Sequence, residues 1–219
     1  MAVKMFGNRG YVKTSMRELA VELGVRLPAL QDCFGSKSSL YEACVQLVTD
    51  HTLASVAPAL KRASETIRDG DLGNATSALE QLIDALVNGH ARPGSRTWSR
   101  FLERSNRDGV VAGGGMLRYT VRGPIVDASA NLLALIGGRH PNDDETRVCA
   151  LLLLGQVHAA HLICNEPGGS MYRSKIDASK IAVIKRQLRE NVRAVVRAMT
   201  ATPVLSTYSQ PNFDLPLSV

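Results

Sequence analysis

The sequence predicts an all-α protein in which an N-terminal three-helix module is followed by a larger helical domain. Apolar residues recur at helical spacing along most of the chain. Short breaks rich in glycine, proline, asparagine or aspartate separate these stretches, and strand-like alternation bounded by hairpin turns is absent. Aromatic residues make up only 5% of the chain, so the core must consist mainly of leucine, valine, isoleucine and alanine, which favours packed helices.

The first fifty residues contain three short predicted helices and the start of a longer one. The first helix covers Ala2–Asn8. The second begins after Thr14, where Ser15 and Glu18 have the spacing of a capping box, and it ends at Gly24. The third helix covers Leu27–Phe34, and a longer helix then starts at residue 38 or 39 and passes through residue 48.

The rest of the chain is predicted to form one helical domain and a tail. The predicted helices are 58–68, 74–87, 95–105, 116–136, 143–165 and 177–200. The tail contains three prolines and no periodicity, so it is expected to be extended or disordered. The expected domains are therefore residues 1–48, residues 49–202 and a tail at 203–219.

Two helices joined by the turn Leu23–Arg26 form a helix-turn-helix unit. In such units the first helix crosses the DNA backbone, and the second presents its N-terminal half to base edges in the major groove. This stretch resembles the N-terminal module of the TetR family, over roughly residues 6–48. The residues that carry the resemblance are Gly10-Tyr11, Thr14-Ser15, Arg17-Glu18-Leu19-Ala20, Leu23-Gly24-Val25, Leu30, Phe34, Ser36-Lys37 and Leu40.

The resemblance implies a ligand-controlled homodimer that binds an operator in double-stranded DNA. Thr14 and Lys37 would contact phosphates, which supply affinity. The side chains implied to face the groove, and so to supply sequence choice, are those of Arg26, Leu27, Ala29 and Gln31. The usual outcome in this family is repression that a small-molecule effector relieves.

An alternative follows from departures within the motif. Gln31 and Asp32 replace residues common in the family's recognition helix, and the first helix is short. A helical small-molecule-binding or adaptor protein with a degenerate helix-turn-helix would show the same features. Specific DNA binding separates the two hypotheses.

Bulk properties agree with a DNA-binding protein inside the cell. The formal net charge is +6, which favours a polyanionic partner. Four scattered cysteines are typical of reduced thiols, and no apolar run is long enough to span a membrane, so a cytoplasmic location is expected. No nucleophile–base or paired-carboxylate arrangement indicates an enzyme, and no cofactor is expected.

Two groups of residues in the larger domain are candidate binding sites. Trp98, Phe101 and Glu103 combine aromatic surface with a polar anchor, as effector pockets do. His158 and His161 are further effector candidates, since with Cys164 they lie three residues apart on one predicted helix. Successive steps of three turn about 60° around a helix, so a pocket wall or helix contact is favoured over a metal site.

The last predicted helix carries an apolar stripe suited to a dimer seam, with burial in the same subunit as the equal alternative. The helix containing Val148–Leu154 was the expected companion in that seam. Basic residues on the opposite side are predicted to be solvated. The stripe consists of Ile181, Ile184, Leu188, Val192 and Val195, and the basic residues are Lys185, Arg186, Arg189, Arg193 and Arg197.

Overall fold

The structure is a computed structural model that describes residues 1–91, 95–108, 118–165 and 177–201. Within these ranges every regular element is a helix. The elements are α1 (Ala2–Arg9), α2 (Met16–Leu23), α3 (Leu27–Phe34), α4 (Lys37–Arg68), α5 (Leu72–Ala91), α6 (Ser95–Asp108), the π-helical turn η1 (Arg118–Arg122), α8 (Gly123–Gly137), α9 (Asp144–Asn165) and α10 (Ala178–Ala201). The all-α prediction is therefore confirmed for the described residues. The predicted tail at 203–219 lies outside them.

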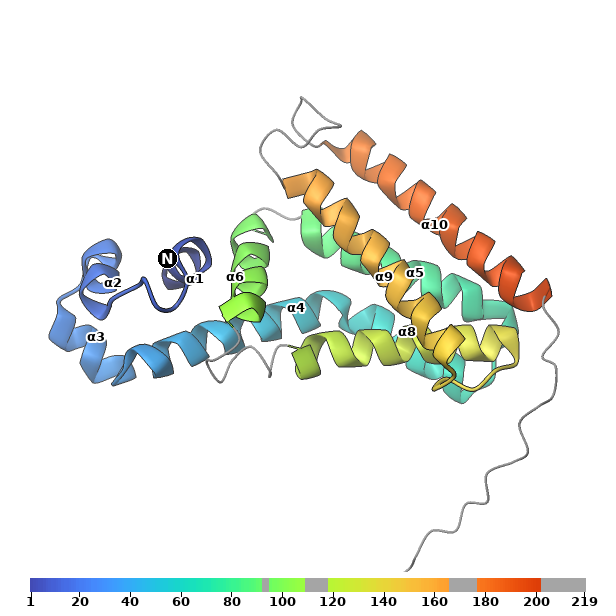
Figure 1. The fold of residues 1–219 in the computed structure, drawn as a ribbon, viewed down its shortest axis with the longest axis horizontal. Coiled ribbons are helices and arrows are strands. Elements are labelled where there is room, and N and C mark those ends of the chain that lie inside the picture. Colours follow the sequence, from blue (N-terminus) through green and yellow to red (C-terminus); the bar gives the residue numbers. More distant parts are fainter. Residues whose placement is uncertain (92–94, 109–117, 166–176, 202–219) are drawn as a thin grey trace, which may run out of the picture.

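The helices form two groups that α4 connects (Figure 1). The first three helices pack around the N-terminal part of α4, and α3 lies at the outer end of this group. The other end contains α5, α8, α9 and α10. Helix α6 stands between the groups and packs against α1. The domain boundary expected at residues 48 and 49 falls inside the continuous helix α4.

Helix α4 corrects the expectation of a separate helix at 58–68. It runs unbroken for 32 residues and includes Pro58. A proline inside a helix removes a hydrogen bond and costs about 3 kcal/mol. Burial of neighbouring apolar residues on both sides of it offsets this cost: Val56 and Ala63 are almost inaccessible. Helix α4 also begins earlier than expected, at Lys37, because the Ser36 hydroxyl accepts the Ser39 N–H at 3.1 Å.

Two apolar clusters hold the described chain together. The larger one joins α4, α5, α8, α9 and α10 and includes Leu79, Leu133 and Leu153. The second joins α1–α4 with α6 and includes Phe6, Leu19, Tyr41 and Phe101. Phe101 belongs to the larger domain in sequence but packs in the cluster of the N-terminal module. The two predicted domains therefore share packed side chains.

The apolar stripe of α10 is buried within its own subunit. Ile184, Leu188 and Val192 are at most 9% exposed and pack in the larger cluster. This observation decides between the two alternatives left open by the sequence, against a seam formed by this stripe. Three apolar side chains of α9, those of Val148, Leu151 and Leu152, are exposed instead.

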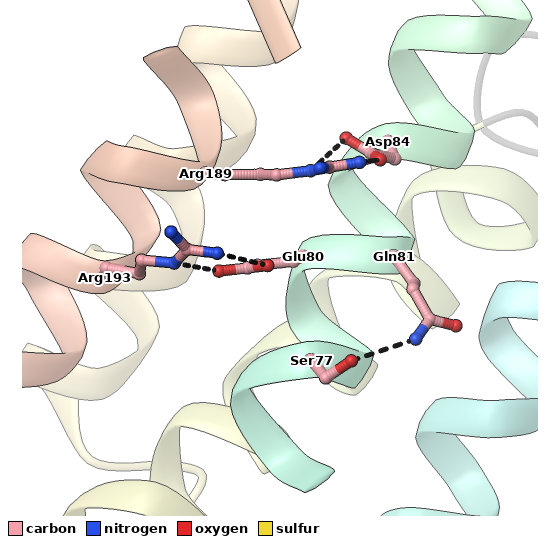
Figure 2. A network of polar contacts seen from close by, with 6 residues as sticks. All are labelled: Ser77, Glu80, Gln81, Asp84, Arg189 and Arg193. Atoms are coloured by element: carbon pink, nitrogen blue, oxygen red, sulfur yellow. Dashed lines mark hydrogen bonds and ion pairs between the residues drawn. The ribbon is translucent and has the colours of Figure 1, made fainter. Parts of the chain in front are cut away.

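Two ion pairs fasten α10 to α5 (Figure 2). The Arg193 guanidinium donates to Glu80 at 2.7 Å, and that of Arg189 donates to Asp84 at 3.2 Å. Both contacts are two-pronged, and the carboxylates are mostly shielded from solvent. The pairing raises the pKa of each arginine through the hydrogen bond to its carboxylate. Arg189 and Arg193, predicted to be merely solvated, are therefore structural contacts.

Among the described residues, no helix has the length and apolarity needed to cross a lipid bilayer.

Candidate nucleic-acid interface

Local contacts fix both ends of α2. The Ser15 side chain accepts the Glu18 N–H at 3.2 Å, and the Glu18 carboxylate accepts the Ser15 N–H at 2.9 Å, which confirms the predicted capping box. These hydrogen bonds lower the pKa of Glu18. Gly24 ends α2 with φ of 69°, a left-handed conformation that glycine adopts without strain. The chain can therefore turn sharply between α2 and α3.

One side of helix α3 packs against the N-terminal cluster, and the other side is exposed. Leu30 is 5% exposed and anchors α3 in the N-terminal cluster, and Leu27 packs half-buried against the same cluster. Ala29, Gln31 and Asp32 are exposed. Figure 1 shows α3 at the outer end of the module, so this surface can approach a ligand as large as DNA.

Three of the four predicted groove-facing residues are exposed, and the fourth packs inward. Arg26 immediately precedes α3 and is exposed, as are Ala29 and Gln31. Leu27 differs because its side chain packs inward, and the helical period directs it away from the exposed surface. Asp32, which was not predicted to face the groove, lies on that surface instead.

The two predicted phosphate contacts have internal partners. The Thr14 hydroxyl is buried and donates to the Gly10 carbonyl at 2.7 Å, which stabilises the turn between α1 and α2. The Lys37 ammonium donates to the Tyr11 carbonyl at 3.1 Å and lies 4.2 Å from the centre of the Tyr11 ring. A lysine carries three donors, so Lys37 can still bind a phosphate, whereas the Thr14 side chain would first have to leave its turn.

Two exposed cations were missed in the sequence. Lys13 and Arg17 flank the start of α2, and both side chains are exposed. In helix-turn-helix proteins the first helix crosses the DNA backbone, so cations at its start suit phosphate contacts. In the sequence, the one sign of these phosphate contacts is the basic character of the two residues near the start of α2. Charge by itself does not distinguish a phosphate contact from an ordinary solvated surface.

The cysteines give a direct measure of which surface is accessible. We expect iodoacetamide to alkylate Cys33 on α3 readily, because it is exposed. Cys44 on α4 is expected to resist alkylation, because burial raises its pKa to about 11 and keeps the thiol protonated. Saturating duplex DNA at low salt is expected to slow the alkylation of Cys33. Peptide mass spectrometry measures the rate at each cysteine. Equal rates with and without bound DNA would place α3 away from the interface.

The predicted effector residues do not form one cluster. Phe101 is completely buried in the N-terminal cluster. Trp98 is half-buried on α6, and its ring lies 4.3 Å from that of His51 on α4. Glu103 is half-buried and lies on α6 with Trp98 and Phe101. His158 lies on α9 among exposed residues, and the His161 side chain is outside the described set.

The histidines and cysteine weighed as metal ligands receive no support from the described residues. No group of three or more histidine, cysteine, aspartate or glutamate side chains with metal-binding geometry occurs among them. The side chains of His161 and Cys164 lie outside the described part, so that search did not include them.

Solved structures with a similar fold extend over nearly the whole chain. A TetR-like transcriptional regulator from Rhodococcus is 23% identical with a TM-score of 0.63, covering 88% of this chain and 91% of its own. A TetR-family regulator from Mesorhizobium loti is 20% identical with a TM-score of 0.58, covering 90% and 92%. The TetR-family regulator PfmR from Thermus thermophilus is 19% identical with a TM-score of 0.54, covering 90% and 94%. These likenesses concern the fold, and no curated protein matches the chain.

The family itself is indicated by the N-terminal module. Residues 1–44 match the model of bacterial regulatory proteins of the tetR family. The matched segment contains α1, α2, α3 and the start of α4, which are the elements that build the exposed surface described above. Members of this family are DNA-binding regulators, not enzymes. The N-terminal module of this chain is therefore that of the TetR family of transcriptional regulators, with its DNA-binding helix-turn-helix.

Proposed function

We propose that this protein is a homodimeric repressor that a small molecule releases from its operator. Two copies of α3 would enter successive major grooves, because one recognition helix reads too few base pairs for useful affinity. An effector bound in the larger domain would favour a spacing of the two α3 helices that no longer fits DNA. The working division is residues 1–48 for DNA and 49–202 for effector and dimer contacts.

The observation that carries the proposal is the packing of α6 on α1 and α4. The Phe101 ring lies 5.3 Å from that of Tyr41, which lies 5.0 Å from Phe6. The Tyr41 hydroxyl also hydrogen-bonds the Ser105 hydroxyl of α6. On the rim, Arg104 of α6 donates to the Arg9 carbonyl at 3.4 Å. A shift of α6 would therefore move the N-terminal helices, which is the link that ligand control requires.

Candidate effector contacts lie on α6 and α4. Trp98 and Glu103 of α6 are half-buried and remain candidates from the sequence. The structure adds Thr49 of α4, whose buried hydroxyl has no hydrogen-bond partner among the described residues. An unsatisfied buried hydroxyl costs about 1–3 kcal/mol, so a ligand that supplied a partner would recover this energy. A small, partly apolar molecule suits residues that combine aromatic surface with a few polar groups.

The outward face of α9 supports the homodimer. Val148 and Leu152 are 52% and 63% exposed, and Leu151 lies between them. One turn further on, Gly155 has open space around it, which would let a second helix approach closely. Exposed apolar residues at helical spacing on one helix suit a self-complementary two-fold contact.

Release requires that the effector distinguish two states. A ligand shifts an equilibrium only by the difference between its affinities for the two conformations. Turning 99% DNA-competent protein into 99% DNA-free protein needs a preference of about 10⁴-fold. The shared aromatic packing makes intermediate positions of α6 unfavourable, which suits a switch between two states.

The test is fluorescence anisotropy of the protein on DNA from its own upstream intergenic region, with scrambled DNA as control, across a salt series. Tight binding that keeps its sequence preference as salt rises is the expected result. Weak binding that is indifferent to sequence and vanishes with salt would contradict the repressor and favour the adaptor hypothesis. Compounds that release the bound operator would then identify the effector class.

A further inference from the structure

The least expected feature of the recognition helix is a carboxylate near the centre of its free surface. Asp32 follows Leu30 by two residues, so it lies about 200° around α3 from the side chain that anchors the helix. Pro28, one turn earlier on the same face, is also exposed. Asp32 makes no hydrogen bond or ion pair within the described part of the chain. Within that part, its charge does not help to hold the fold together.

A carboxylate on this surface restricts the DNA sequences that α3 can approach. An ionised aspartate accepts hydrogen bonds and donates none. Guanine and thymine present acceptors to the major groove, so they would repel it. Adenine places its N7 acceptor beside its N6 donor, whereas cytosine carries its N4 amino donor with no acceptor of its own on the groove edge. Cytosine is therefore the base whose edge best suits Asp32.

We propose that Asp32 selects the operator by accepting a hydrogen bond from the N4 amino group of one cytosine in each half-site. This inference rests on the operator binding proposed above and adds the identity of a base that is read. Because the phosphates repel a carboxylate, the residue would contribute little to affinity. Its contribution would be the rejection of sequences that leave the charge without a donor.

The neighbouring side chain makes the proposal more specific. Gln31 is exposed on the flank of the same surface and is also without a partner in the described chain. A glutamine amide pairs best with adenine, through N6 and N7. Adjacent residues on one helix reach adjacent bases, so the preferred half-site should contain a cytosine close to an adenine.

The experiment is a selection of binding sites from a random duplex library with the full chain and three variants. Asp32→Ala removes the carboxylate, and Asp32→Asn replaces it with an amide that suits adenine. Glu22→Ala is the matched control, because it removes from α2 an exposed carboxylate that has no partner among the described residues. Circular dichroism checks the helical content of each variant. Both positions are exposed, so folding is expected to be preserved.

The wild-type protein and Glu22→Ala are expected to enrich a half-site with cytosine at one fixed position. Replacing that cytosine with thymine should weaken wild-type binding about tenfold, the size of one lost base contact. Asp32→Ala should lose the preference at that position alone, and Asp32→Asn should change it toward adenine. Placing N4-methylcytosine there should weaken the wild type and leave Asp32→Ala unaffected, because the methyl group replaces the groove-facing donor.

Several results would overturn the inference. Retention of the same cytosine preference by Asp32→Ala would show that another residue reads this base. A uniform gain in affinity for all sequences would show that Asp32 only repels phosphates. If neither the wild type nor Glu22→Ala enriches any sequence, the operator-binding function itself fails, and the role of Asp32 fails with it.

Discussion

Replacing Leu152 with arginine is expected to convert the dimer into a monomer and to reduce operator affinity by about 100-fold or more. The Leu152 side chain is 63% exposed at the centre of the apolar face of α9. Two-fold symmetry would bring two arginines close together in an apolar contact, where their charges would be both desolvated and mutually repelled. Loss of the second half-site removes the gain from bivalent binding, which reaches 10²–10⁴-fold.

Light scattering and anisotropy measure the two effects separately. The wild type is expected near twice the 23.6 kDa mass of one chain, and the variant near that mass. Leu72→Arg is the matched control, because Leu72 is 61% exposed at the start of α5, on a different helix. It adds the same charge and should leave mass and operator affinity unchanged. A Leu152→Arg protein that remains dimeric would move the interface away from α9.

Local signals explain why the helix-turn-helix could be predicted closely from the sequence. The capping box at Ser15 and Glu18, the left-handed Gly24 and the first-turn Pro28 act within a few residues of each helix end. The same reasoning failed at Pro58, where a local helix breaker is overridden by burial of residues from α4 against distant helices. Propensity is a local property, whereas the compensating packing is not.

Periodicity predicts that a face is buried without saying what buries it. The stripe on α10 was equally compatible with a dimer seam and with its own subunit, and α5, α8 and α9 turn out to cover it. In the same way, Phe101 was a reasonable pocket residue beside Trp98. Its position in the N-terminal cluster depends on α1, more than ninety residues earlier in the sequence. No pattern in a single sequence encodes such a contact.

A contact missed in the sequence leads to the second large expected effect. Gly7 of α1 lies directly against the backbone of α6: a Cβ there would be 3.0 Å from the Phe101 nitrogen and 3.3 Å from its Cα. Both are backbone atoms, so the steric clash of an added Cβ could be relieved only if the two helices moved apart. The flanking contact of Arg100 with Asn8 at 3.4 Å opposes that movement. Glycine at this position therefore permits the close approach of the two helices.

Gly7→Ala is expected to lower the free energy of unfolding by about 1 kcal/mol. Overpacking costs about 1–3 kcal/mol, and the better helix propensity of alanine returns up to about 1 kcal/mol. Gly89→Ala on α5 is the control, because its added Cβ would meet only the Ser55 hydroxyl, at an ordinary 3.4 Å. That variant should be stabilised, so urea unfolding of the two proteins is expected to shift in opposite directions.

The single tryptophan shows whether α6 itself moves. Trp98 lies on α6, and its ring contacts that of His51 on α4 at a tilt, so displacement of α6 should change its fluorescence emission. We expect the change in Gly7→Ala and not in Gly89→Ala, together with altered operator affinity in the first variant only. If both variants are stabilised equally and Trp98 emission stays constant, α1 and α6 are not in close contact in solution. The larger domain would then have to control the DNA-binding helices through α4 alone.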